Sequence, residues 1–267
     1  MDEEINFLFE MAKKIINFAE NSFKEGLDSR RRANILSIVA ESFLLKNIKT
    51  YKSIYELCKK NLGMDSLILS RTLYESCLCF AYIIQPLHNK DHEMVENRAN
   101  LYVNYESKEK EKKIKQFKKL KNDGKCLDWF KQMDEELRRR NLTEDIDGFN
   151  KSLQEYESCL EKDKNYVSKY FHHKPNNSKD TWNSLSVLKT AEFTGEIYEC
   201  HYHMIYGYLS GFIHSSPITS KSVMKAEDNF GVKQSLSFAS ENFLYLLKNI
   251  NDSLELDLNE YLDNIFK

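Results

Sequence analysis

The chain has 267 residues, of which 41% are hydrophobic and 12% aromatic, so it can bury a core and is not a disordered protein. Its formal net charge of −2 argues against a body that is basic throughout, as in a dedicated nucleic-acid-binding or membrane-surface protein. It contains 8 glycines and 3 prolines. Sheets joined by tight turns use more of both, so we expect an all-α, multi-helix bundle.

Amphipathic spacing predicts helices through the first part of the chain. Residues 3 to 24 place apolar side chains three and four positions apart and should form a helix that ends near Gly26. Ser29 is suited to cap a second helix. A third helix should begin at Tyr51 and stop at Gly63.

The segment DSLILSRTLYESCLCFAYIIQ, residues 65 to 85, is the most apolar stretch of the chain. It has about the spanning length of a membrane helix, near 20 residues, but Arg71 and Glu75 lie at its centre. We therefore predict a buried core helix that Pro86 closes, and no membrane span.

The middle third is polar and poor in aliphatic residues. Helices are predicted over residues 92–121, 126–140 and 144–163. We interpret residues 1–267 as a single helical domain in which residues 91–165 form an excursion, a charged helical arm that protrudes from the bundle.

The stretch KEKEKKIKQFKKLK, residues 108 to 121, is strongly cationic on a predicted helix. It is either a solvated helix face or a positively charged binding surface for RNA, DNA or an acidic partner. In the second case the nucleic-acid contacts would come from Lys112, Lys115, Lys118 and Lys119.

The last third returns to an apolar pattern after the loop KYFHHKPNNSKD. Asp180 should cap the next helix, Gly195 should break it, and residues 196 to 214 should form another. A long amphipathic helix is predicted from about Val232. Its apolar stripe consists of Leu236, Ala239, Phe243, Leu247, Ile250 and Leu254.

Arg71 and Glu75 lie four residues apart on a helix whose other positions are nearly all apolar. Helical geometry places both on one face, within reach of each other. Burying such a pair removes much of the hydration of each ion, so something must compensate. The pair is either a buried structural ion pair, or it faces a cleft and handles a ligand or a phosphate.

Ser210 and His214 differ by one helical turn and about 40°, so we expect them to be neighbours. His214 would lie in the last turn before Pro217, where the helix C-terminus and a nearby Glu75 both favour the protonated ring. Such a histidine suits a general acid or a phosphate contact. Alternatively, it only caps the helix and hydrogen-bonds to Glu75.

No pattern points to a metal or a cofactor. His201 and His203 should lie on opposite flanks of one helix, and the 6 cysteines include no C-x-x-C pair. The chain starts with an acidic and then amphipathic stretch instead of a secretory leader. We therefore expect no metal, no cofactor, and a cytoplasmic protein with reduced thiols.

A set of residues in register across two distant helices carries a resemblance: SRTLYES at 70–76, then Ala191, Gly195, Tyr202, Tyr206, Ser210 and His214. Over residues 30–90 and 180–220 the chain resembles the bacterial family called domain of unknown function 5677. That family is similar in outline to the helical HEPN group, many of whose members are ribonucleases of toxin–antitoxin, CRISPR and phage-defence systems. Those enzymes carry an arginine shortly before the histidine. Tyr208 to Ser210 include none, so Arg71 would have to replace it from another helix.

Three hypotheses for function follow. The first is a helical binding or scaffold module of a bacterial antiviral defence or stress system. The second is a metal-independent, HEPN-like endoribonuclease of toxin or abortive-infection type, in which Arg71 stabilises phosphate charge, His214 transfers protons, and Glu75 and Ser210 orient them. The third is a small-molecule or nucleotide-handling enzyme. The expected partner is RNA or a protein, with no membrane, and the resemblance to HEPN-like domains, which often pair two-fold, implies a homodimer.

Overall fold

The computed structural model describes residues 3–29, 34–123, 127–140, 185–206 and 228–265, with some positions between 151 and 183. All regular structure in these ranges is helical, which confirms the predicted all-α class. The contacts divide the chain into two compact units. The first unit combines residues 1–97 with residues 185–267, and the second unit comprises residues 98–184.

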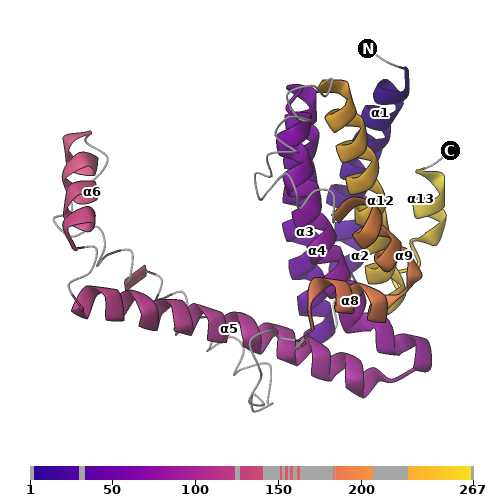
Figure 1. Cartoon of the computed structure of the whole chain (residues 1–267). Helices are drawn as coiled ribbons and strands as arrows, with labels where there is room; N and C mark the ends of the chain where they lie inside the picture. Colours follow the sequence, from indigo (N-terminus) through magenta and orange to yellow (C-terminus); the bar gives the residue numbers. More distant parts are fainter. Residues whose placement is uncertain are drawn as a thin grey trace. The chain divides into compact units, whose positions relative to one another are not determined.

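The core of the first unit is a bundle of long helices that lie side by side (Figure 1). Helix α4 (Gly63–Ile84) packs most extensively against α12 (Asp228–Leu254), and both also contact α3 (Ile35–Lys59). Helix α1 (Glu3–Phe18) packs against α12. The predicted apolar stripe of α12 is buried along most of its length, from Leu236 to Ile250.

The first predicted helix does not end near Gly26. Helix α1 continues through a π-helical turn, η1 (Ala19–Phe23), into α2 (Lys24–Ser29), so that Gly26 lies inside a helix. A glycine in a helix costs about 1 kcal/mol relative to alanine but does not by itself end the helix. The predicted cap, Ser29, is instead the last residue of α2.

The second predicted helix, after Ser29, and the third, from Tyr51, form a single helix in the structure. Helix α3 is continuous through Tyr51, because no glycine or proline interrupts the sequence between its ends. Its N-cap is Asn34, whose side chain accepts a hydrogen bond of 2.8 Å from the Ser37 amide. Gly63, predicted as a stop, is the first residue of α4. The chain turns just before it, through Asn61, which has a left-handed φ of 59°.

Helix α4 is the apolar helix of the sequence, and its buried face lies in the bundle core. Its fully buried side chains include Leu73, Tyr74 and Phe80. Among the described residues, the stretch Gly63–Asn89 is the one helical segment with the length and apolarity of a membrane span, and 56% of its apolar window is buried inside the fold. The core helix of a bundle has the same composition.

The short helices that follow residue 184 bring a second set of side chains to α4. Helix α8 (Val187–Thr194) begins later than predicted, because Ser186 caps it by accepting a hydrogen bond from the Lys189 amide. The predicted cap, Asp180, lies outside the described residues. Gly195 breaks the helix as predicted, with a φ of 138° that favours glycine. Helix α9 (Glu196–His201) and a π-helical turn, η3 (Tyr202–Tyr206), follow directly.

Two more short elements complete the first unit. The 3-10 turn η2 (Gln85–Asn89), which contains Pro86, closes α4 as predicted. At the other end of the chain, α13 (Asn259–Asn264) follows α12 and contacts it. A side-chain amide organises this junction, since Asn251 accepts a hydrogen bond of 2.8 Å from the Leu258 amide.

The second unit contains most of α5 (His92–Asn122) and α6 (Leu127–Arg139), close to the predicted ranges. The predicted helix over residues 144–163 and the loop KYFHHKPNNSKD fall largely or wholly outside the described residues. That residues 91–165 protrude as an arm stays a prediction.

Candidate functional site

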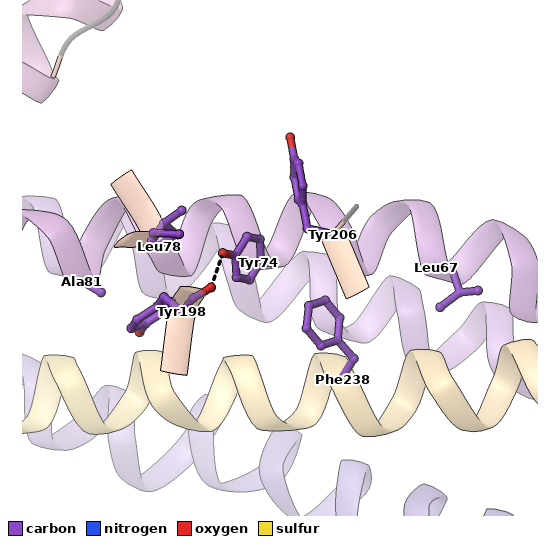
Figure 2. Packing of buried hydrophobic residues seen from close by; sticks show 8 residues of the cluster. Leu67, Tyr74, Leu78, Ala81, Tyr198, Tyr206 and Phe238 are labelled. Carbon is purple, nitrogen blue, oxygen red and sulfur yellow. Dashed lines mark hydrogen bonds between the residues drawn. The ribbon is translucent and has the colours of Figure 1, made fainter. Parts of the chain in front are cut away.

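A cluster of aromatic side chains joins α4, α9, η3 and α12. Figure 2 shows Tyr74 of α4 between Tyr198 and Tyr206, with Phe238 of α12 beside it. The Tyr74 hydroxyl donates a hydrogen bond of 2.8 Å to the Tyr198 carbonyl oxygen, and its ring centroid lies 5.7 Å from that of Tyr206. This packing fixes the position of Tyr206 above the surface of α4.

Arg71, one turn before Tyr74 on α4, reaches the same tyrosine. Its Nη2 donates a hydrogen bond of 2.7 Å to the Tyr206 hydroxyl, and its Cζ lies 4.3 Å from the centroid of the Tyr206 ring. Its Nε donates a hydrogen bond of 3.0 Å to Oε1 of Glu75. Tyr202 stacks on Tyr206 with ring centroids 4.8 Å apart. Hydrogen bonds at Nε and Nη2 thus hold the guanidinium in position.

The Arg71–Glu75 pair is not sealed in the core. The Arg71 side chain is 17% exposed, whereas the Glu75 side chain is 41% exposed. A pair with one solvated partner stabilises the fold by only about 0.3–0.5 kcal/mol. The pair therefore lies at an accessible surface and is not a fully buried structural ion pair. That it faces a cleft and handles a ligand or a phosphate stays a prediction.

The pKa values of Arg71 and Tyr206 both lie above the ordinary values of these side chains. Burial lowers the pKa of Arg71, but the Tyr206 hydroxyl and the Glu75 carboxylate outweigh it, so the pKa lies above its ordinary value. Burial, together with Glu75, raises the pKa of Tyr206 to about 12, although the nearby guanidinium opposes this shift. At neutral pH Arg71 is a cation and Tyr206 a neutral phenol that receives its hydrogen bond.

The third nitrogen of the Arg71 guanidinium, Nη1, differs from the other two. Among the described residues, Nη1 is buried and has no hydrogen-bond partner. Buried polar atoms almost always have partners, and an unsatisfied one costs about 1–3 kcal/mol or more for a charged group. Glu75 and Tyr206 thus hold the guanidinium through Nε and Nη2, while Nη1 has no partner among the described residues.

The predicted site is recovered in part. Arg71 and Glu75 are brought together as their spacing predicted, while Ser210 and His214 lie outside the described residues. That His214 meets Arg71 stays a prediction. Tyr206 belongs to the pattern that carries the family resemblance but was not predicted as a site residue, because its contact with Arg71 is made between distant helices.

The four predicted nucleic-acid-binding lysines are all exposed on α5. Lys112 lies 3.8 Å from Glu109, and Lys118 forms an ion pair with Glu157. At 100° per residue, Lys112, Lys115 and Lys119 fall within about 60° of one another on the helix surface. Ile114, which is buried, lies on the other side. Lys112, Lys115 and Lys119 thus form one cationic face within the second unit, whereas Lys118 lies about 60° beyond Lys115, toward Ile114.

The two histidines of α9 and η3 differ in exposure. As predicted, His201 and His203 face different ways: His201 is buried and His203 is exposed. Where the structure describes side chains, no group of three or more His, Cys, Asp or Glu residues is arranged to hold a metal ion.

Comparison with known proteins identifies a family but no individual relative. No curated protein and no solved structure matches the chain. The model of a family of unknown function, DUF5677, matches residues 37–231, well over half of the 267-residue chain. The match is more extensive than the two segments that carried the resemblance, because it also includes the polar middle third. The chain belongs to the DUF5677 family.

Proposed function

We propose that this protein is a helical binding module whose recognition site is centred on Arg71 and takes an anionic ligand, a phosphate or carboxylate group. The buried Nη1 of Arg71, which has no hydrogen-bond partner in the part of the chain that the structure describes, carries this proposal. A guanidinium offers a fork of donors that matches the oxygens of phosphate and carboxylate groups. A ligand oxygen at Nη1 would satisfy a nitrogen that has no hydrogen-bond partner among the described residues.

The neighbours of Arg71 support a ligand site more than a purely structural contact. Glu75 and Tyr206 hold Nε and Nη2, so the side chain is already ordered before a ligand arrives. Such pre-organisation reduces the entropy lost on binding. Because Glu75 is 41% exposed, the Nε side of the guanidinium faces solvent, and a ligand oxygen would reach the buried Nη1 only if the side chains around it shift.

We place this module in a bacterial antiviral defence or stress system, with RNA or a protein as its partner. The support is the resemblance of the family to the HEPN group, together with the cationic face of α5, which suits a polyanion. The same resemblance supports a homodimer, and cysteines without a C-x-x-C pair support a cytoplasmic protein with reduced thiols. The binding module could thus act as the sensing or scaffold part of such a system.

A metal-independent endoribonuclease is the second candidate, and one observation favours it. Tyr206, which holds Arg71, directly precedes in sequence the stretch that contains Ser210 and His214. In this mechanism Arg71 stabilises charge on the phosphate, His214 transfers protons, and Glu75 and Ser210 orient them.

Binding and cleavage can be tested with the same probes. Inorganic phosphate and a short single-stranded RNA are titrated into the wild type and into Arg71→Lys, Arg71→Ala and Lys49→Ala variants by calorimetry. Lys49 is an exposed lysine on α3 and controls for the loss of one positive charge. We expect binding that Arg71→Ala abolishes, that Arg71→Lys weakens and that Lys49→Ala leaves unchanged. Equal affinity of all variants would refute the Arg71 site.

The second candidate needs a chemical readout. The RNA is incubated with wild type and His214→Ala protein, with and without a chelator, and the products are separated by size. Cleavage that persists in chelator and is lost in His214→Ala would establish the ribonuclease. Binding without cleavage leaves the binding module as the function.

A further inference from the structure

A pocket that shares no residue with the Arg71 site lies between α1, α12 and α13. Its volume is about 470 Å³, which falls within the range of about 300–1,000 Å³ that small-molecule sites occupy. One wall is a single face of α12, because its lining residues follow one another three and four positions apart. Along this face lie Glu241, Leu244, Tyr245 and Lys248.

The opposite wall consists of Met11 of α1 with Leu262 and Asp263 of α13. Contacts inside the protein hold α13 there. The ring of Tyr261 stacks on Phe18 of α1 with ring centroids 6.3 Å apart. Where α13 begins, Nδ2 of Asn251 donates a hydrogen bond of 2.9 Å to Oδ1 of Asn259. The pocket is therefore formed without a ligand, which lowers the entropy lost on binding.

The interior of the pocket is apolar and its edges are charged. Leu244 and Leu262 are 9% and 8% exposed, and Met11 beside them is half-buried. The charged side chains Glu241, Lys248 and Asp263 are all exposed. Small-molecule sites commonly combine an apolar lining with a few polar groups that orient the ligand. This lining suits a ligand with an apolar body and one charged end.

The charges of the lining decide the sign of that end. Two acidic side chains, Glu241 and Asp263, stand against one lysine, Lys248. The hydrogen bond with His201 also holds the pKa of Glu241 below its usual range, against the opposing effect of burial. A ligand that carries a positive charge is therefore the electrostatic complement of the pocket.

Glu241 and Tyr245 define where the positive charge would lie. They are one helical turn apart on the same face of α12, so an ammonium group can contact the carboxylate and the face of the phenol ring together. The contact of Glu241 with His201, at 3.3 Å, is made through Oε1 and does not involve Oε2. Lys248 is seven residues further along, about 10 Å in helical rise, at the other end of the pocket.

We propose that this pocket is a binding site for a small organic cation. The ammonium group lies against Glu241 and Tyr245, and an aliphatic or aromatic body covers Leu244 and Leu262. The site is independent of the proposed anion site at Arg71, since the two have opposite charge and no residue in common.

Three probes of nearly equal size and different charge test the proposal: benzylammonium, benzyl alcohol and benzoate. Each is titrated into the full chain, and binding is followed by ligand-observed NMR. We expect benzylammonium to bind about three- to tenfold more tightly than benzyl alcohol, the combined effect of a partly exposed ion pair and a cation–π contact. Benzoate should bind most weakly. A preference for benzoate, or no saturable binding of benzylammonium, would overturn the proposal.

Variants locate the probe within the pocket. Glu241→Gln should abolish the preference for benzylammonium over benzyl alcohol, whereas Glu260→Gln, which removes an exposed carboxylate of α13 outside the pocket, should leave it unchanged. Lys248→Gln should increase the affinity for benzylammonium, because it removes a like charge. An undiminished preference in Glu241→Gln would show that the cation binds elsewhere.

A second variant blocks the pocket and does not depend on charge. Ser237 lines the pocket from an exposed position on α12, so Ser237→Trp places a large ring in the pocket while the core residues stay as they are. We expect this variant to keep its helical circular dichroism and to lose binding of benzylammonium and benzyl alcohol alike. Wild-type affinity in Ser237→Trp would show that the probes do not occupy this pocket.

Discussion

At the scale of single residues, the contacts of Arg71 differ in strength because their partners differ in exposure. Tyr206 is 7% exposed, while the side chain of Glu75 is 41% exposed. Water can replace a missing carboxylate at the exposed side, but not a missing hydroxyl at the buried side. The phenol, which belongs to the family pattern but was not predicted as a site residue, should therefore matter more to the fold than the predicted ion pair.

Removing the phenol oxygen tests this difference. Tyr206→Phe keeps the ring under the guanidinium but leaves Nη2 without its acceptor, so we expect a loss of about 1–3 kcal/mol in the free energy of unfolding. Glu75→Gln should cost no more than about 0.5 kcal/mol. Urea denaturation measures both. A larger loss for Glu75→Gln than for Tyr206→Phe would contradict this ranking.

Glu241 makes a pH-dependent contribution whose sign follows from its lowered pKa. Its pKa lies below the unfolded value of about 4.3, so the native state favours the ionised form. The added stability is present above that value and disappears as the pH falls through the folded pKa. Because the side chain is 50% exposed, its size should stay under about 1 kcal/mol.

The measurement is the difference in free energy of unfolding between wild type and Glu241→Gln, taken between about pH 6 and pH 3. We expect the wild type to be the more stable at the upper end, and the difference to vanish at the lower end. Glu260→Gln, on the exposed surface of α13, controls for the removal of one carboxylate. A difference that grows in acid would show that the sign is wrong.

At the scale of helices, local sequence predicted where helices occur better than where they end. The continuity of α3 follows from the absence of any breaker, and its start is set by the Asn34 cap. Gly63 looked like a stop because glycine commonly follows a helix. Its actual role is tertiary: it lies against the backbone of α12 at Gly231, an approach that sequence spacing cannot reveal.

Gly63→Ala tests this close approach of two helices. A Cβ at this position would lie 2.5 Å from the carbonyl carbon of Gly231 and still closer to the Val232 amide nitrogen, so α4 and α12 would have to separate. We expect a loss of about 1–3 kcal/mol or more in thermal or urea unfolding, as for an overpacked core. Gly26→Ala is the matched control, since its Cβ would meet only the flexible Leu258 side chain, at 3.1 Å. Equal stability of the two variants would mean that the helices do not depend on this close approach.

At the scale of the whole molecule, the two candidate surfaces for anions belong to different units. Arg71 and Tyr206 lie in the first unit, whereas the cationic face of α5 lies in the second. The fold class and the polar middle third were predictable because composition and periodicity are properties of the chain itself. The partners of Arg71 were not, because they depend on which helices pack together.

Because the two surfaces lie in different units, the role of the cationic face of α5 can be tested separately from that of Arg71. If Lys112, Lys115, Lys118 and Lys119 bind RNA, replacing all four with glutamine should lower the slope of log affinity against log salt by about 0.7 for each phosphate that is no longer neutralised. Lys112 and Lys118 already have acidic neighbours, so the decrease should be smaller than four fully engaged lysines would give. The control replaces four exposed lysines of the first unit, Lys13, Lys14, Lys49 and Lys60, and so changes the net charge equally. Fluorescence anisotropy at several salt concentrations measures the slopes. Equal slopes for the two variants would reduce the α5 face to a solvated helix surface, and would leave Arg71 as the only anion site proposed for the protein.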